Sequence, residues 1–281
     1  MNRRLRKARP DRARLIVVDL GGTWVRVAAS GPPQRRFRAR TPGAAHLPPL
    51  LARLWRRWRI GRGDLVALGV ASRGVWTAAE RRVLASRLRR FAPRVVVISD
   101  VEAAYLAALG AAPGVLLLAG TGSIALGRDQ SGRWARAGGL GALLGDDGSA
   151  FAIGRDWLRR PGANPLLARR LGRSSDAVPR IAAYTPTVLR RARRGNREAR
   201  RIVREAQHAL ALLVITTTRR LRLRAPVTVS WAGTLMRNTG FRAGVWREVR
   251  RRGVRLNPVA PRAQAASPSA WRPLLERPRV V

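Results

Sequence analysis

A chain of 281 residues with 46% hydrophobic residues can bury one large or two ordinary cores, which excludes a disordered protein. The absence of cysteine excludes disulfides, thiolate zinc sites and iron–sulfur clusters. The 57 Lys and Arg residues against 15 Asp and Glu residues give a formal net charge of +42, and the basic residues are spread along the whole sequence. We therefore expect nucleic acid to bind only non-specifically, through positive charge.

Apolar runs are short throughout the sequence. None approaches the roughly 18 residues that a membrane-spanning helix needs, and the run from Leu15 to Val18 is too short for a signal-peptide core. We therefore expect a cytoplasmic protein with no membrane partner.

The first predicted unit follows a basic arm at residues 1–14 and consists of strand, turn and strand. Strands are predicted at 15–19, 24–29 and 34–40. Asp19 closes the first strand, where a carboxylate can hold Mg²⁺ through its water shell. The turn Gly21-Gly22-Thr23 offers backbone N–H groups and a hydroxyl, which suit phosphate oxygens.

A second carboxylate follows a buried-type strand at 94–98. Ser99 and Glu102 have the spacing of a capping box, so Asp100 is expected in the first turn of a helix at the carboxyl end of that strand. Ligands bind at such strand ends in open α/β sheets. The alternative is that Asp100 only complements the helix dipole. Between these two parts, the sequence predicts an amphipathic helix around 47–59, a strand at 65–71 and a helix around 83–91.

The pattern restarts at Gly114, which predicts an internal duplication. Strands are expected at 115–119, 123–128 and 133–137, with Gly120-Thr121-Gly122-Ser123 at the tip of the first hairpin. Such a tip suits phosphate, although any tight hairpin also favours Gly and Ser. The rest of this half is expected to contain helices at 149–160, 202–217 and 241–251 and strands at 227–231 and 254–256. The predicted domains are residues 1–113 and 114–281.

Five motifs in this order resemble the BadF/BadG/BcrA/BcrD ATPase family, in particular its N-acetylglucosamine and glucosamine kinases. They are Asp-Leu-Gly-Gly-Thr at 19–23, Ser-Asp-Val-Glu-Ala-Ala at 99–104, Ala-Gly-Thr-Gly-Ser-Ile-Ala at 119–125, Gly-Gly-Leu-Gly-Ala-Leu-Leu-Gly-Asp-Asp-Gly-Ser at 138–149 and Ala-Gly-Thr-Leu at 232–235. The resemblance implies an α/β fold of two RNase H-like (actin-like ATPase) domains with a nucleotide cleft between them.

The resemblance also implies ATP and Mg²⁺ as cofactors, an amino sugar as substrate and Asp100 as the general base that also contacts the sugar. The implied phosphate and adenosine contacts are Gly21, Gly22, Thr23, Gly120, Thr121, Gly122, Ser123 and Gly233. The implied sugar contacts are Gly139, Leu140, Gly141 and Asp146, while Asp19 is the implied metal residue. Whether the chain forms a homodimer is left open.

Two alternatives remain at this point. Leu140 stands where the kinases have Trp, residues 41–45 lack their sugar-contacting Asn, and two prolines interrupt 263–273. A non-catalytic nucleotide-binding sensor on the same fold would show these departures. A polyanion-binding protein, whose basic surface is the function, would instead bind nucleic acid in a salt-dependent way.

Overall fold

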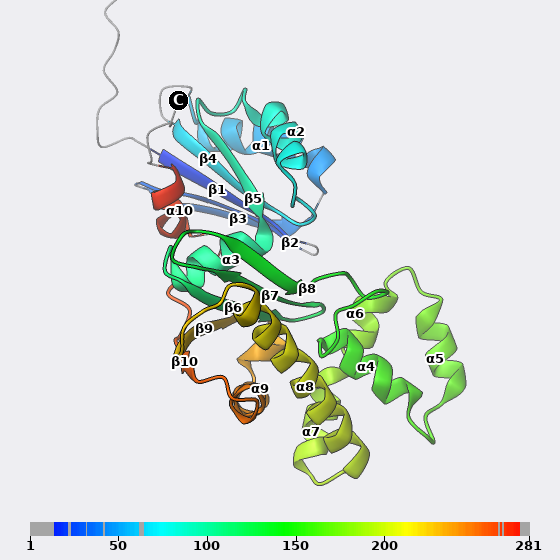
Figure 1. Ribbon diagram of the computed structural model, residues 1–281. Coiled ribbons are helices and arrows are strands. Elements are labelled where there is room, and N and C mark those ends of the chain that lie inside the picture. The colour runs from blue at the N-terminus through cyan, green and yellow to red at the C-terminus, as the bar shows by residue number, and fades with distance from the viewer. Residues whose placement is uncertain are drawn as a thin grey trace, which may run out of the picture. The chain divides into compact units, whose positions relative to one another are not determined.

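Two compact units, each built on its own five-stranded sheet, make up the protein (Figure 1). The computed structural model describes residues 14–275 apart from 22–23, 32, 42, 62–64, 264 and 266. Unit 1 comprises Met1–Gly110 and Ala263–Val281, and unit 2 comprises Ala111–Arg262.

The sheet of unit 1 has the order β3-β2-β1-β4-β5. Its strands are β1 (Arg14–Leu20), β2 (Trp24–Ala29), β3 (Arg35–Arg40), β4 (Leu65–Ser72) and β5 (Val95–Ser99). The first three strands pair antiparallel, whereas β4 is parallel to both β1 and β5. The carboxyl ends of β1 and β5 therefore meet the same edge of the sheet, with one strand between them.

Helices cover both faces of this sheet: α1 (Leu47–Trp58), α2 (Ala78–Leu88), α3 (Asp100–Leu109) and α10 (Pro268–Leu275). Alternation along β1 divides the core, because Ile16, Val18 and Leu20 pack with α1 and α2 whereas Leu15 and Val17 pack with α3 and α10. The amphipathic pattern of α1 is confirmed, since its leucines and Trp58 are buried while its arginines face solvent.

Unit 2 repeats the same strand order and directions. Its sheet is β10-β9-β6-β7-β8, built from β6 (Gly114–Ala119), β7 (Ser123–Arg128), β8 (Trp134–Gly138), β9 (Val227–Ala232) and β10 (Leu256–Pro258). Here β6 takes the place of β1 and runs parallel to β9, which runs parallel to β10. The predicted duplication is therefore confirmed, although the last strand lies two residues beyond the predicted 254–256.

The helices of unit 2 are α4 (Ala150–Arg159), α5 (Pro165–Gly172), α6 (Ala177–Ala182), α7 (Thr185–Arg193), α8 (Arg197–Arg220) and α9 (Thr239–Arg251). Three of them, α5 to α7, lie in the segment 161–196, for which no helix was predicted. Asn164 caps α5 by accepting hydrogen bonds from two backbone N–H groups of its first turn. No helix within the described part of the chain is both long and apolar enough to cross a membrane.

The C-terminal segment differs from the predicted division, which assigned residues 114–281 to the second domain. Trp271 of α10 is fully buried on the sheet of unit 1, where its ring fits over Gly69 of β4. A Cβ at Gly69 would lie 2.5 Å from this ring, so only glycine admits the tryptophan. The two prolines do not prevent this helix: Pro268 occupies its first position, and Pro273 lies within its range.

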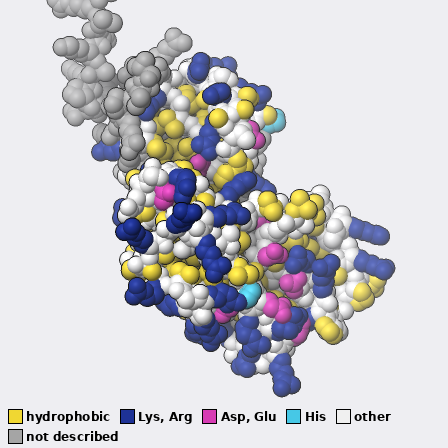
Figure 2. Space-filling view, in the orientation of Figure 1, with side chains coloured by type: hydrophobic (Ala, Val, Ile, Leu, Met, Phe, Trp, Pro, Cys, Tyr) yellow, Lys and Arg dark blue, Asp and Glu magenta, His cyan; other side chains and the backbone are white. Residues whose placement is uncertain are grey.

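Basic side chains are distributed over the surface. Figure 2 shows Lys and Arg side chains on both units in this view, interspersed with apolar and neutral groups and not gathered into one stripe. Acidic side chains are few, as the composition requires.

Candidate functional site

The carboxylate of Asp19 lies at the carboxyl end of β1, on the face of the sheet covered by α3 and α10. Its residue is only 8% exposed, and Oδ2 accepts a hydrogen bond from Nη1 of Arg26 at 2.9 Å. Arg26 stands directly opposite on β2, so strand register sets this ion pair. Burial raises the pKa of Asp19, although the Arg26 guanidinium acts in the opposite direction.

Asp100 is the first residue of α3, as the capping box predicted. Ser99 Oγ accepts from the Glu102 N–H at 3.1 Å, and Glu102 Oε2 accepts from the Ser99 N–H at 2.7 Å. Burial raises the pKa of Asp100, and the charge of Asp19 raises it further, while Arg73 lowers it. The structure therefore brings Asp19 and Asp100 close enough to interact electrostatically.

As a single carboxylate, Asp19 can take part in a magnesium site only together with other ligands. Within the described residues, no group of three or more His, Cys, Asp or Glu side chains could hold a metal ion alone. Mg²⁺ usually keeps several waters and takes one or two carboxylates plus substrate phosphates. Gly21 donates its N–H to the Trp24 carbonyl at 3.0 Å and so begins the predicted turn, but Gly22 and Thr23 lie outside the described residues.

In unit 2, the predicted phosphate turn connects β6 and β7 and docks on the N-terminus of α4. The Gly120 N–H donates to the Gly122 carbonyl at 2.9 Å. The Gly120 and Thr121 carbonyls accept from the N–H groups of Ala150 and Phe151 at 2.8 and 3.3 Å. These bonds use donors of the first turn of α4 and hold the hairpin tip rigidly.

Gly233 lies directly against this turn. Its φ is +89°, and a Cβ there would come within 2.2 Å of the Ala119 carbonyl oxygen. A Cβ on Gly120 would likewise lie 3.6 Å from Thr234 N. The structure therefore places the turns after the parallel strands β6 and β9 side by side, at the carboxyl end of the sheet.

The loop between β8 and α4 is tied to the same turn. Asp146, at φ +60°, accepts a hydrogen bond from the Ser123 N–H at 3.2 Å, and Ser123 Oγ donates to the Asp147 carbonyl at 2.8 Å. Ser123 is 2% exposed, so both of its donors hold the loop. The Gly139 N–H donates to the Ser123 carbonyl, whereas Leu140 is exposed and Gly141 has open space beside its Cα.

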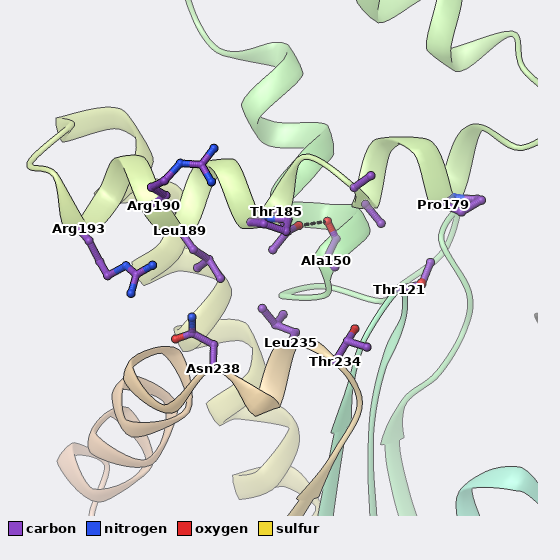
Figure 3. A pocket seen from close by; sticks show the side chains of 13 residues that line it. Thr121, Ala150, Pro179, Thr185, Leu189, Arg190, Arg193, Thr234, Leu235 and Asn238 are labelled. Carbon is purple, nitrogen blue, oxygen red and sulfur yellow. Dashed lines mark hydrogen bonds between the residues drawn. The ribbon is translucent and has the colours of Figure 1, made fainter.

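A cavity of about 470 Å³ opens beside the turn, entirely within unit 2 (Figure 3). Among the predicted site residues, only Thr121 contributes to its lining. Sequence reasoning missed the others: Ala150, Pro179, Ala182, Ala183, Thr185, Pro186, Leu189, Arg190, Arg193, Thr234, Leu235 and Asn238. Thr185 Oγ1 donates to the Ala150 carbonyl at 2.7 Å and joins α7 to α4. A proline near the start of α7 was the available sequence signal for this wall.

The chain matches the BadF/BadG/BcrA/BcrD ATPase family over residues 12–266. It is a member of that family. The family assignment made from the five motifs is therefore confirmed, and so is the fold of two actin-like ATPase domains.

Relatives of this family member include named sugar kinases. An N-acetylmuramic acid/N-acetylglucosamine kinase of Clostridium acetobutylicum is 25% identical over 202 residues, which cover 62% of this chain and 66% of the relative. An N-acetyl-D-glucosamine kinase of Dictyostelium discoideum is 52% identical over 46 residues, 16% of this chain and 14% of the relative. The chain thus spans less than two thirds of these curated relatives.

A solved structure matches the whole architecture. A Chromobacterium violaceum protein proposed to be an N-acetylglucosamine kinase has a TM-score of 0.67 and 21% identity, and the match covers 95% of this chain and 100% of that one. This likeness shows the fold.

Proposed function

We propose that this ATPase-family member is an ATP-dependent sugar kinase that phosphorylates a hydroxyl of an amino sugar such as N-acetylglucosamine or glucosamine. The observation that carries the proposal is the place of Asp100 directly after β5, one strand removed from the end of β1 with Asp19; burial raises the pKa of Asp100 there, and the charge of Asp19 raises it further. Phosphoryl transfer needs positioning, charge neutralisation and a base for the alcohol proton. The kinase names of the curated relatives support the substrate class.

Asp100 is the proposed base. Because burial and the charge of Asp19 disfavour its charged form, the carboxylate of Asp100 binds a proton more tightly than an exposed carboxylate does. It would accept the proton of the sugar hydroxyl as the oxygen attacks the γ-phosphate. Asp19 would hold Mg²⁺ through water, and the ion would neutralise charge on the phosphates.

The nucleotide contacts belong to unit 2. Gly120, Thr121 and Gly122 would hold the phosphates, and adenosine would lie against Gly233, whose neighbour Thr234 lines the adjoining cavity. Ser123 would contribute indirectly, because its hydroxyl holds the loop between β8 and α4. For the sugar, we propose Gly139, Leu140, Gly141 and Asp146; Leu140, 63% exposed, is accessible to a ligand.

The test measures ATP consumption at moderate salt with glucosamine, N-acetylglucosamine, N-acetylmuramic acid, glucose or no sugar. We expect one amino sugar to raise the rate, and Asp100→Asn to lower kcat by about 10²- to 10⁴-fold, the usual contribution of a general base. Asp156→Asn is the matched control, because that carboxylate contacts Arg155 on α4.

A melting curve separates loss of catalysis from loss of folding. Because the pKa of Asp100 is raised in the fold, its stabilising contribution is present at low pH and is lost as pH rises through that pKa. At pH 7, Asp100→Asn should therefore melt at an equal or higher temperature than the wild type. If no sugar raises the rate while ATP still protects the fold against heat, the kinase is excluded and the non-catalytic sensor stands.

A further inference from the structure

The cavity of unit 2 has two chemically distinct ends. Thr121 and Thr234 lie at the end formed by the two glycine turns, whereas Arg190, Arg193 and Asn238 lie at the other end (Figure 3). The rest of the lining is mostly apolar, and Leu189 and Leu235 lie between the two ends (Figure 3). If the turns hold phosphates, the nucleobase occupies the end with the arginines.

The polar side chains at the base end offer hydrogen-bond donors. Arg190 and Arg193 can only donate, because a guanidinium has N–H donors and no acceptor. Asn238 caps α9, and its Oδ1 accepts the Phe241 N–H at 2.9 Å. Since this bond uses the amide oxygen, the amide nitrogen of Asn238 can donate to a ligand in the cavity.

Neither arginine is neutralised by an acid. Within the described residues, no ion pair involves Arg190 or Arg193, and Arg190 donates only to the hydroxyl of Thr187 at 3.2 Å. Their positions on α7, three residues apart, place both on one face of the helix. The base end is therefore lined by two exposed arginines whose guanidinium donors are not engaged by an acid.

Purines differ in how they meet such donors. Guanine presents O6 and N7, two adjacent acceptors that a guanidinium binds in bidentate fashion, whereas adenine presents N7 beside an amino donor. An arginine that faces this edge of adenine would place its N–H donors against the adenine amino group, which is also a donor. The donor-rich end thus matches guanine better than adenine.

We infer that Arg190 and Arg193 are base-specificity residues and that GTP is a phosphoryl donor for this protein, at least as efficient as ATP. The inference rests on the proposed kinase function. In the reaction, the sugar oxygen forms a bond to the γ-phosphorus, the bond from this phosphorus to the β–γ bridging oxygen breaks, GDP leaves, and Asp100 accepts the hydroxyl proton.

The experiment compares kcat/KM for GTP, ITP and ATP with the accepted sugar. Inosine keeps O6 and N7 but lacks the 2-amino group, so ITP should match GTP. Replacing both arginines, Arg190→Ala with Arg193→Ala, should lower the GTP-to-ATP ratio by about tenfold to a hundredfold, the discrimination of one bidentate contact. Arg194→Ala removes one guanidinium charge just beyond α7, outside the cavity lining, and should leave the ratio unchanged.

Thermal protection by GDP and ADP tests the base site without turnover. Greater protection by GDP than by ADP that is lost in the double variant supports the inference, even if no sugar is phosphorylated. The absence of sugar phosphorylation would contradict only the kinase proposal. Sugar phosphorylation by ATP with poor use of GTP overturns the inference and leaves the kinase proposal intact. A drop for ITP relative to GTP would overturn the assignment of the recognised edge.

Discussion

At the residue scale, the proposed chemistry centres on Asp100 and the three charges around it. Burial and the charge of Asp19 raise the pKa of Asp100 and Arg73 lowers it, while Arg26 pairs with Asp19. Arg73 follows β4, and its N–H donates to the Leu20 carbonyl at 3.1 Å, so the backbone fixes its place beside the end of β1. The sheet order thus puts a cation next to the proposed base.

Arg73→Gln should therefore shift the pH dependence of the reaction. Without this cation, the pKa of Asp100 rises further, so Asp100 becomes protonated at a higher pH. The acid limb of kcat/KM should move to higher pH, with little change on the alkaline side. Arg82→Gln, at an exposed position of α2, is the control. An acid limb that stays in place or moves to lower pH would show that Arg73 does not act on the base.

At the scale of elements, the site depends on two turns whose backbones touch. Gly233 and Gly253 both have positive φ, +89° and +82°, so alanine costs about 1 kcal/mol of backbone strain at either position. A Cβ at Gly253 meets no atom within 4 Å, whereas one at Gly233 meets the Ala119 carbonyl. Comparing alanine variants at these two positions therefore separates the cost of backbone strain, which both share, from the cost of the steric clash, which only Gly233 has.

Gly233→Ala should thus destabilise the protein more than Gly253→Ala and should abolish thermal protection by nucleotide. The physical reason is that the turns after β6 and β9 must separate to admit the methyl group. Urea unfolding measures the loss of stability, and melting with and without nucleotide measures the thermal protection. Equal losses in both variants would mean that the contact between the turns contributes nothing.

At the scale of the molecule, the end of the chain completes the core of the unit in which the chain begins. Trp271 is buried over β4, its Nε1 donates to the Ala265 carbonyl at 2.8 Å, and Arg94 donates to the Leu274 carbonyl at 3.0 Å. Helix α10 also contacts β1 and α3. The side of the sheet that carries Asp19 is therefore closed by residues from both ends of the sequence.

Trp271→Ala should cost about 3–5 kcal/mol, as expected for a buried aromatic side chain. Hydrogen exchange should become faster in β1 and β4 but not in β6 and β9, because the two units have separate cores. Ser269→Ala, at an exposed position of α10, should change little. Unchanged exchange in β1 would show that α10 does not stabilise unit 1.

The sequence by itself determined the motif positions and most of the elements, although not the helices α5, α6, α7 and α10. Apolar runs ending in Asp19, Ser99 and Ala119 predicted strands, and the Ser99–Glu102 capping box placed Asp100 at a helix start. These features depend on neighbours in the chain, whose sterics and hydrogen bonds a local pattern records. The repeated order of elements likewise predicted the duplicated sheet.

Only the tertiary structure decided which distant residues meet. Residues after Pro258 show no periodicity, so the burial of Trp271 over Gly69 depends on a gap that the rest of unit 1 leaves uncovered. Arg190 and Asn238 converge because α7 and α9 pack around one cavity, and Ser123 turns inward because the loop at Asp146 closes over it. Long-range packing sets these contacts, and no local sequence pattern encodes it.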